Sequence, residues 1–175
     1  NHAKRQDELS RYYTESYKLA KIISENSKEE DGLNLVVTSG GGPGIMEAAN
    51  RGAHDTNSKS VSLSVVLPHE EESNEFVTPE LNFLFHYFAI RKMHFLIRAQ
   101  AVVAFPGGFG TLDEFTEVLT LIQTGKIDKM PILLFGEKFW RKIINFEALA
   151  EEGMISPDDV NLFHYVESAE EAWSI

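Results

Sequence analysis

The sequence contains no cysteine. A disulfide framework, a cysteine-ligated metal site and a cysteine nucleophile are therefore excluded. Basic residues are also scarce, because 16 Lys and Arg stand against 27 Asp and Glu and give a formal net charge of −11. Non-specific nucleic-acid binding needs a basic surface, so we expect no nucleic-acid partner. A small anionic ligand remains compatible with this charge, since helix dipoles and a few cations act locally.

Long apolar runs are missing as well. None approaches the roughly 20 residues that a membrane-spanning helix needs, so we expect no membrane partner. No secretory leader is visible, and the expected location is the cytoplasm. Over 175 residues, 43% are hydrophobic and 25% are charged, which is typical of one globular domain with a substantial core.

Strand and helix patterns alternate along the chain. Apolar runs predict strands at residues 33–38, 61–67, 101–105, 131–135 and 163–166. Helical spacing predicts helices at residues 7–24, 45–50, 90–99, 112–122 and 139–152. N-cap serines predict further short helices that start after Ser156 and after Ser168. Gly52 is expected to mark the end of the second helix. This alternation predicts an α/β fold with a parallel sheet covered by helices on both faces.

The segment 81–88 is dense in aromatic side chains. We interpret it either as part of the core or as a surface that meets another subunit.

Two glycine-rich turns each follow a predicted strand and precede a predicted helix. They are residues 39–44 (SGGGPG) and 106–110 (PGGFG). Glycine lets the backbone approach a ligand, and the helix start behind it presents N–H groups that bind phosphate without a lysine. Neither turn has the third glycine of a dinucleotide fingerprint or the Gly-Lys-Ser/Thr of a P-loop. Because ligands bind beyond the carboxyl ends of parallel strands, we expect both turns to line one cleft.

Several polar and charged residues near these turns have two interpretations each. Thr111 and Glu114 have the spacing of a capping box, and the alternative to this structural interpretation is a role in chemistry. Arg91 and Lys92 are either surface cations or cleft residues that meet substrate oxygens. Glu47 is either a residue favoured by the helix dipole or a cleft carboxylate. No His, Asp and Glu cluster has metal-ligand spacing, so we expect neither a metal nor another cofactor.

Three motifs in this order resemble the LONELY GUY (LOG) family of cytokinin riboside 5′-monophosphate phosphoribohydrolases, often mislabelled lysine decarboxylases. The motifs are residues 39–47, the pair 91–92, and residues 106–114 (PGGFGTLDE). The resemblance implies a Rossmann-like three-layer αβα fold with a parallel sheet, and a homodimer. It also implies hydrolysis of the N-glycosidic bond of a purine nucleoside 5′-monophosphate, either AMP or a cytokinin riboside monophosphate, to free base and ribose 5-phosphate.

The matching motifs imply roles for individual residues. Glu114 and Arg91 would be the catalytic residues. The substrate and its phosphate would be held by Gly41, Gly42, Gly44, Glu47, Lys92, Gly107, Gly108, Gly110 and Thr111.

Relatives usually carry a strand before the first helix, and residues 1–175 are therefore expected to form a single domain of this type that lacks the family's first strand. The alternative to an enzyme is a non-catalytic protein that binds or carries a nucleotide or a molybdenum cofactor. Release of free base from AMP would discriminate between the two.

Overall fold

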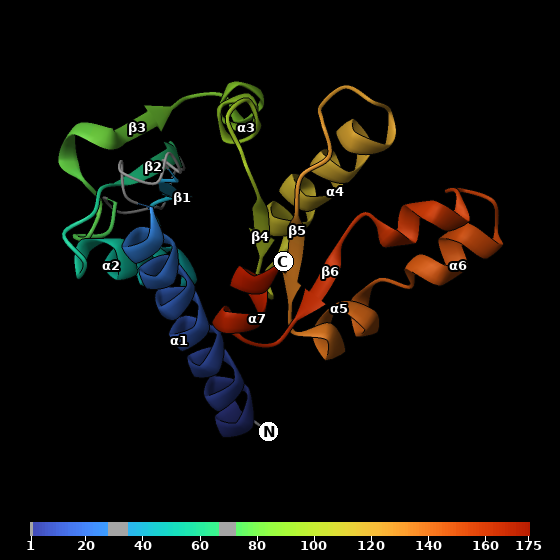
Figure 1. Cartoon of the computed structure of the whole chain (residues 1–175), viewed down its shortest axis with the longest axis horizontal. Coiled ribbons are helices and arrows are strands. Elements are labelled where there is room, and N and C mark those ends of the chain that lie inside the picture. Colours follow the sequence, from blue (N-terminus) through green and yellow to red (C-terminus); the bar gives the residue numbers. More distant parts are fainter. Residues whose placement is uncertain (1, 28–34, 67–72) are drawn as a thin grey trace. The chain divides into compact units, whose positions relative to one another are not determined.

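The computed structural model describes residues 2–27, 35–66 and 73–175 of the chain (Figure 1). These residues form two compact units, the first comprising residues 1–98 with residue 174 and the second residues 99–173 with residue 175. Every strand pair is parallel, in the orders β1-β2-β3 and β4-β5-β6. The predicted fold class, α/β of the Rossmann-like three-layer type, is confirmed, with the strands in two sheets. The assignment of the chain to a single domain stays a prediction.

The described residues of the first unit form a three-stranded sheet and three α-helices. Its elements are α1 (His2–Asn26), β1 (Val37–Ser39), α2 (Ile45–His54), β2 (Ser60–Val65), a 3₁₀ turn η2 (Pro79–Leu81), β3 (Asn82–Phe85) and α3 (Phe88–Leu96). Residues 33–34 and 67 of two predicted strands lie outside the described residues. Because β1 and β2 are parallel, the turn that follows β1 lies at the same sheet edge as the end of β2.

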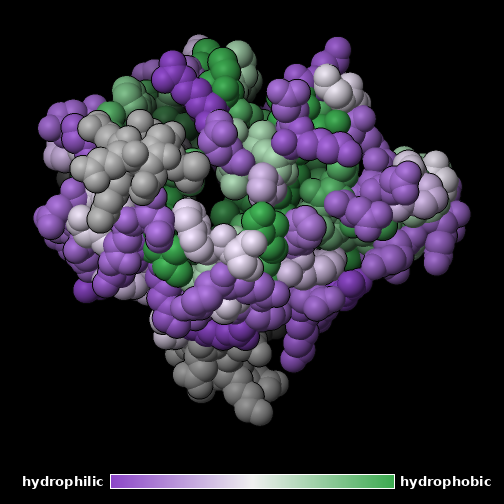
Figure 2. Space-filling view, viewed as in Figure 1, coloured by the Kyte–Doolittle hydropathy of each residue, from purple (hydrophilic) through white to green (hydrophobic). Residues whose placement is uncertain are grey.

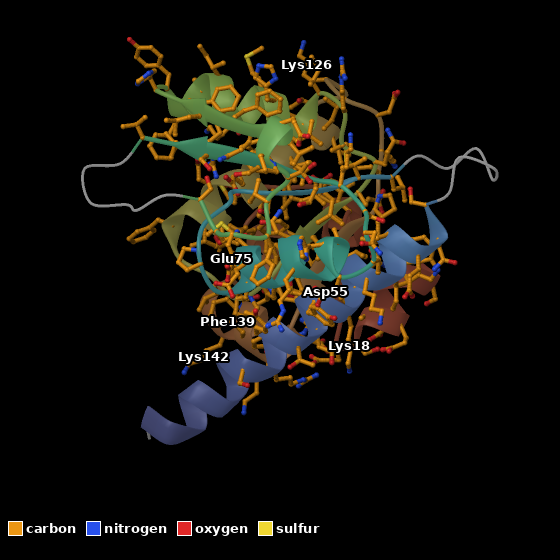
Figure 3. The ribbon with its side chains drawn as sticks, turned by 90° about the vertical axis from the view of Figure 1, so that its left-hand side faces the viewer. Lys18, Asp55, Glu75, Lys126, Phe139 and Lys142 are labelled. Carbon is orange, nitrogen blue, oxygen red and sulfur yellow. The ribbon has the colours of Figure 1, made fainter. Side chains whose placement is uncertain are left out.

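Gly52 lies inside α2, where α1 packs along it (Figure 1). A Cβ at this position would lie 2.8 Å from the Cβ of Ala20 and would also overlap the carbonyl oxygen of Tyr17. The prediction that Gly52 ends the helix is therefore wrong: α2 continues to His54, and the glycine permits close helix packing. At the end of α2, Asp55 accepts a 3.0 Å hydrogen bond from the Tyr17 hydroxyl, and Figure 3 shows Asp55 beside α1.

The second unit is built around β5, whose four residues are all buried. Its elements are β4 (Val102–Ala104), α4 (Phe109–Gln123), β5 (Ile132–Phe135), α5 (Glu137–Ile143), α6 (Phe146–Glu151), η3 (Pro157–Asn161), β6 (His164–Val166) and α7 (Ala169–Ser174). Trp140 is fully buried beside Phe115, and its indole N–H donates a 3.0 Å hydrogen bond to the carbonyl oxygen of Phe135. This bond satisfies the polar end of a large core side chain.

The helix predicted over residues 139–152 is in fact two helices, α5 and α6. Between them, Ile144 is extended and the Asn145 side chain accepts a 3.0 Å hydrogen bond from the backbone N–H of Ala148. Asparagine is a preferred N-cap because its side chain replaces a missing helical acceptor, and here that preference starts a new helix.

The aromatic segment forms an exposed surface and not part of the core. Phe83 and Leu84 lie on β3, which pairs only with β2 among the described strands, and their exposed fractions are 47% and 65%. Together with residues on and beside α3, they make what we call the β3–α3 apolar face, formed by Phe83, Leu84, Tyr87, Phe88, Ile90, Met93 and Ile97. Figure 2 shows hydrophobic side chains on the surface over α3. In the described part of the chain, no helix combines the length and apolarity needed to cross a membrane.

Candidate functional site

The first glycine turn, residues 39–44, connects β1 to α2 as predicted. Gly41 has a φ of 76°, and a Cβ there would lie 2.8 Å from the Ser64 hydroxyl and would overlap Ser62. Gly44 has a φ of 71° and is the N-cap of α2, with no side chain capping the helix. The turn therefore needs glycine for both conformation and space, and the first N–H groups of α2 follow it directly.

Arg91 reaches this turn from α3. Its Nε donates a 2.6 Å hydrogen bond to the carbonyl oxygen of Leu63, near the carboxyl end of β2. Its guanidinium stacks over Phe95 at 4.8 Å, and a Cβ at Gly40 would lie 2.8 Å from Arg91 Nη2. Arg91 is thus a partly buried residue held against the first glycine turn, and the surface-cation interpretation does not apply to it. Lys92, the next residue, is half-buried on α3.

Glu47 lies in the first turn of α2, and its carboxylate accepts a 3.0 Å hydrogen bond from the Tyr13 hydroxyl of α1. A carboxylate in this position is stabilised by the positive end of the helix dipole. The structural role suggested by the sequence is therefore present, while contact with a substrate stays a prediction.

The second glycine turn connects β4 to α4. Gly107, Gly108 and Gly110 are exposed, and so is Phe109, with 91% of its surface accessible. A Cβ at Gly107 would overlap the side chain of Thr111, so this glycine gives the threonine its place in the first turn of α4. The junction presents the backbone of a helix start to solvent, which is the arrangement that binds phosphate.

Thr111 and Glu114 do not form a capping box. Helix α4 begins at Phe109 with Gly108 as its N-cap, and no side chain caps it. Thr111 is therefore the third residue of the helix and not its cap, and Glu114 is the sixth. The capping-box interpretation of Thr111 and Glu114 is therefore wrong, while the functional role of Glu114 stays a prediction.

The polar side chains that hold the first glycine turn were not predicted from the sequence. Asn50 is fully buried in α2, and its Oδ1 accepts hydrogen bonds from the Ser39 hydroxyl at 2.7 Å and from Asn74 Nδ2 at 3.0 Å. Asn50 Nδ2 donates to the Ser60 hydroxyl at 3.0 Å. A buried asparagine inside a helix is unusual. The sequence places Asn50 in a predicted helix, but it does not show that the side chain of Asn50 is buried.

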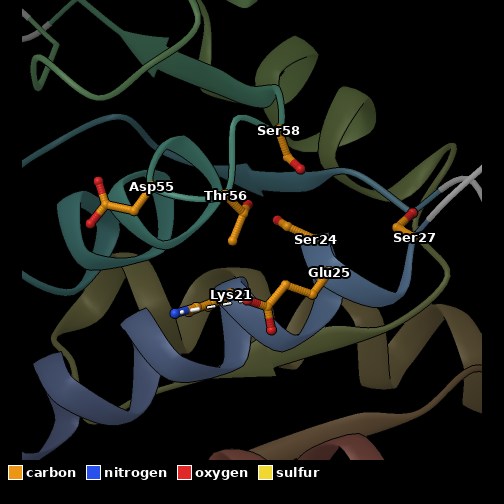
Figure 4. A pocket seen from close by; sticks show the side chains of 7 residues that line it. All are labelled: Lys21, Ser24, Glu25, Ser27, Asp55, Thr56 and Ser58. Atoms are coloured by element: carbon orange, nitrogen blue, oxygen red, sulfur yellow. Dashed lines mark ion pairs between the residues drawn. The ribbon is translucent and has the colours of Figure 1, made fainter.

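A polar hollow with a volume of about 380 Å³ lies elsewhere in the first unit (Figure 4). It is lined by Lys21, Ser24, Glu25, Ser27, Asp55, Thr56 and Ser58. These residues come from the end of α1 and from the connection that precedes β2, so the hollow lies at the amino edge of the sheet. It is therefore separate from the first glycine turn, which follows the carboxyl end of β1. Among residues 2–27, 35–66 and 73–175, no group of three His, Asp or Glu side chains could hold a metal ion.

The predicted site residues thus fall into two groups. In the first unit, the structure brings Arg91 to the turn that contains Gly41, Gly42 and Gly44, with Glu47 just behind it. In the second unit, Gly107, Gly108, Gly110, Thr111 and Glu114 share one strand–turn–helix junction. The expectation that both turns line one cleft stays a prediction.

A protein-family model described as "Possible lysine decarboxylase" matches residues 46–175, well over half of the chain. The chain belongs to this family. It is 31% identical over 147 residues to the cytokinin riboside 5′-monophosphate phosphoribohydrolase LOG of Oryza sativa subsp. japonica, an alignment that covers 82% of this chain and 59% of the relative. It is 29% identical over 145 residues to LOG3 of Arabidopsis thaliana, which carries the same enzyme name, covering 81% of this chain and 66% of the relative.

These relatives confirm the resemblance to the LOG family. The chain spans about two thirds or less of the length of the curated relatives it matches.

Proposed function

We propose that this LOG-family chain is a phosphoribohydrolase that cleaves the N-glycosidic bond of a purine nucleoside 5′-monophosphate. The products would be the free base and ribose 5-phosphate. The observation that carries the proposal is the β4–α4 junction, where an exposed glycine turn opens an uncapped helix and a glutamate follows one turn later. The names of the relatives support the reaction type.

Glu114 is the residue to which we assign the chemistry. Cleavage of a glycosidic bond develops positive charge on the ribose ring, and a carboxylate beside the ring stabilises that charge or orients the attacking water. Because Gly108 is the cap of α4, the Glu114 side chain has no capping role at the helix start.

Arg91 would position the substrate or offset negative charge near the reacting bond, and the glycine turns would bind the phosphate. A guanidinium offsets negative charge through paired hydrogen bonds, and the 2.6 Å bond from Arg91 Nε to Leu63 fixes its direction. Helix starts such as those of α2 and α4 bind phosphate through backbone N–H groups. Binding energy gained at the phosphate, with Gly41, Gly42, Gly44, Gly107, Gly108, Gly110, Thr111, Glu47 and Lys92 as candidates, would orient the scissile bond.

The test is a panel of nucleoside 5′-monophosphates that includes AMP and a cytokinin riboside monophosphate, with release of free base measured by chromatography. We expect base and ribose 5-phosphate in equal amounts from at least one purine member. If the chain binds a member of the panel tightly but releases no base, the hydrolase proposal is wrong and a binding protein is favoured.

We also propose that the chain forms a homodimer through the β3–α3 apolar face. Met93 and Ile97 have exposed fractions of 64% and 70%, and all seven residues of the face fall within residues 83–97. Several exposed large apolar side chains in one segment are typical of an interaction site, and a second copy of the same chain supplies a matching face.

A further inference from the structure

All three backbone carbonyl groups of Gly40, Gly41 and Gly42 accept hydrogen bonds from side chains. The Ser64 hydroxyl donates to Gly40 at 3.1 Å. Asn74 Nδ2 lies 3.0 Å from the carbonyl oxygen of Gly41 and 3.1 Å from that of Gly42, and the backbone N–H of Asn74 also donates to Gly41 at 2.8 Å. The oxygens of the turn are therefore directed into the protein.

This arrangement sets the direction of the N–H group that the turn can offer to a ligand. The peptide bond between Gly41 and Gly42 is trans, so its N–H points opposite to its carbonyl group. Since Asn74 binds the Gly41 carbonyl, the N–H of Gly42 points away from Asn74. An anion is attracted by such N–H groups and repelled by carbonyl oxygens, so the orientation of these peptides decides whether the turn can bind phosphate.

The amide of Asn74 is itself oriented by its neighbours. Its Oδ1 accepts a 3.2 Å hydrogen bond from the backbone N–H of Phe76, which leaves Nδ2 facing the turn. Asn50 Oδ1 accepts from the same Nδ2 at 3.0 Å, and Asn50 is fixed in turn by Ser39 and Ser60. Rotating the Asn74 amide by about 180° would place its oxygen against three other oxygen acceptors, those of Gly41, Gly42 and Asn50. Only the observed orientation therefore lets every group form its hydrogen bond.

We propose that Asn74 is a positioning residue that orients the first glycine turn for phosphate binding. The inference rests on the proposed function, because it assigns the substrate phosphate to that turn. Asn74 acts through the backbone of Gly41 and Gly42 and makes no contribution to bond cleavage. Its loss therefore affects binding of the phosphate more than turnover.

The sharpest variant is Asn74→Asp, which keeps the shape and the acceptor for Phe76 but replaces the donating amide by a carboxylate oxygen. Asn57→Asp is the matched control, since it makes the same change in the same unit at an exposed residue of the connection that precedes β2. Asn74→Ser is a second variant that adds no charge. The serine side chain is too short to bind the carbonyl groups of Gly41 and Gly42, so this variant still tests the proposal if Asn74→Asp does not fold.

In the AMP hydrolysis assay, we expect Asn74→Asp and Asn74→Ser to raise KM by about tenfold or more while kcat stays within about threefold, consistent with a lost binding interaction. The inhibition constant of ribose 5-phosphate should rise by the same factor in both Asn74 variants, and Asn57→Asp should match the wild type. If both Asn74 variants fold and keep KM and the inhibition constant within about twofold of the control, the inference is overturned.

A second measurement does not depend on activity. Inorganic phosphate is titrated into ¹⁵N-labelled protein, and the amide resonance of Gly42 is followed by NMR. The wild-type resonance should shift, with an affinity that Asn74→Ser weakens about fivefold or more. If the wild type releases no base but shows this shift and Asn74→Ser weakens the affinity, the proposed function fails and the positioning role stands. If phosphate leaves the Gly42 resonance unmoved, or if Asn74→Ser binds phosphate as tightly as the wild type, the positioning role fails.

Discussion

The guanidinium of Arg91 occupies the space that a side chain at Gly40 would fill. A Cβ on Gly40 would lie 2.8 Å from Arg91 Nη2 and 2.8 Å from the sulfur of Met46, both at the ends of flexible side chains. Gly40→Ala should therefore displace the guanidinium at little cost in stability. We expect kcat/KM to fall about tenfold or more, with the midpoint of thermal unfolding within a few degrees of wild type.

A double-mutant cycle with Arg91→Ala checks that this effect passes through the arginine. Because Gly40→Ala acts by moving Arg91, the double variant should be no less active than Arg91→Ala alone. Additive losses in kcat/KM would show that Gly40 acts independently of Arg91.

Glu114→Gln should lower kcat roughly 100-fold or more, the scale of removing one electrostatic stabiliser of the transition state. The amide keeps the size of the side chain, so KM should change little. Base release from AMP is measured, with Asp113→Asn as the control because Asp113 is an exposed neighbour that undergoes the same loss of charge. A folded Glu114→Gln protein with near-normal turnover would rule out the assigned role.

Met93→Lys should convert the proposed homodimer into a monomer, because it places a charge in the β3–α3 apolar face. Met154→Lys is a matched control in the second unit, where Met154 has an exposed fraction of 70% against 64% for Met93. Molar mass is measured by light scattering after size-exclusion chromatography. A dimer that survives Met93→Lys, or a monomeric wild type, contradicts the proposed interface.

The pKa of Asp55 is lowered by hydrogen bonds from the His54 ring and the Tyr17 hydroxyl, which favour the charged carboxylate. A lowered folded-state pKa gives stability that is present above the ordinary pKa of aspartate and is lost as the pH falls through the folded value. In urea denaturation, the wild type should therefore have a higher midpoint concentration of urea than Asp55→Asn near pH 6. The two midpoints should converge in strong acid. A difference that persists to about pH 2 would mean that the charge of Asp55 is not responsible.

Features with a local cause were predicted from the sequence. Ser156 caps η3 in a capping box, and Ser168 caps α7, because a serine side chain satisfies N–H groups only two or three residues away. The two glycine turns were placed between the correct strands and helices for the same reason. Strand–turn–helix order is visible in about ten neighbouring residues, so it needs no knowledge of the rest of the fold.

Features set by tertiary contacts were not predicted. Gly52 has the local appearance of a helix end, and only the approach of Tyr17 and Ala20 of α1 explains it. Asn145 breaks a pattern that reads as one continuous helix, since capping competes with helical periodicity there. The hydrogen bond from Asn74 to the carbonyl oxygen of Gly41 joins residues 33 positions apart in the chain. No rule based on the spacing of residues in the sequence predicts such a pair.

The buried Trp140 gives this chain a built-in optical signal. Both tryptophans, Trp140 and Trp173, belong to the second unit, whereas four of the five tyrosines, Tyr12, Tyr13, Tyr17 and Tyr87, belong to the first. Indole fluorescence excited at the red edge of absorption therefore reports on the second unit alone. Followed beside far-ultraviolet dichroism, it reveals in one unlabelled sample whether the two halves of the chain melt together or one after the other.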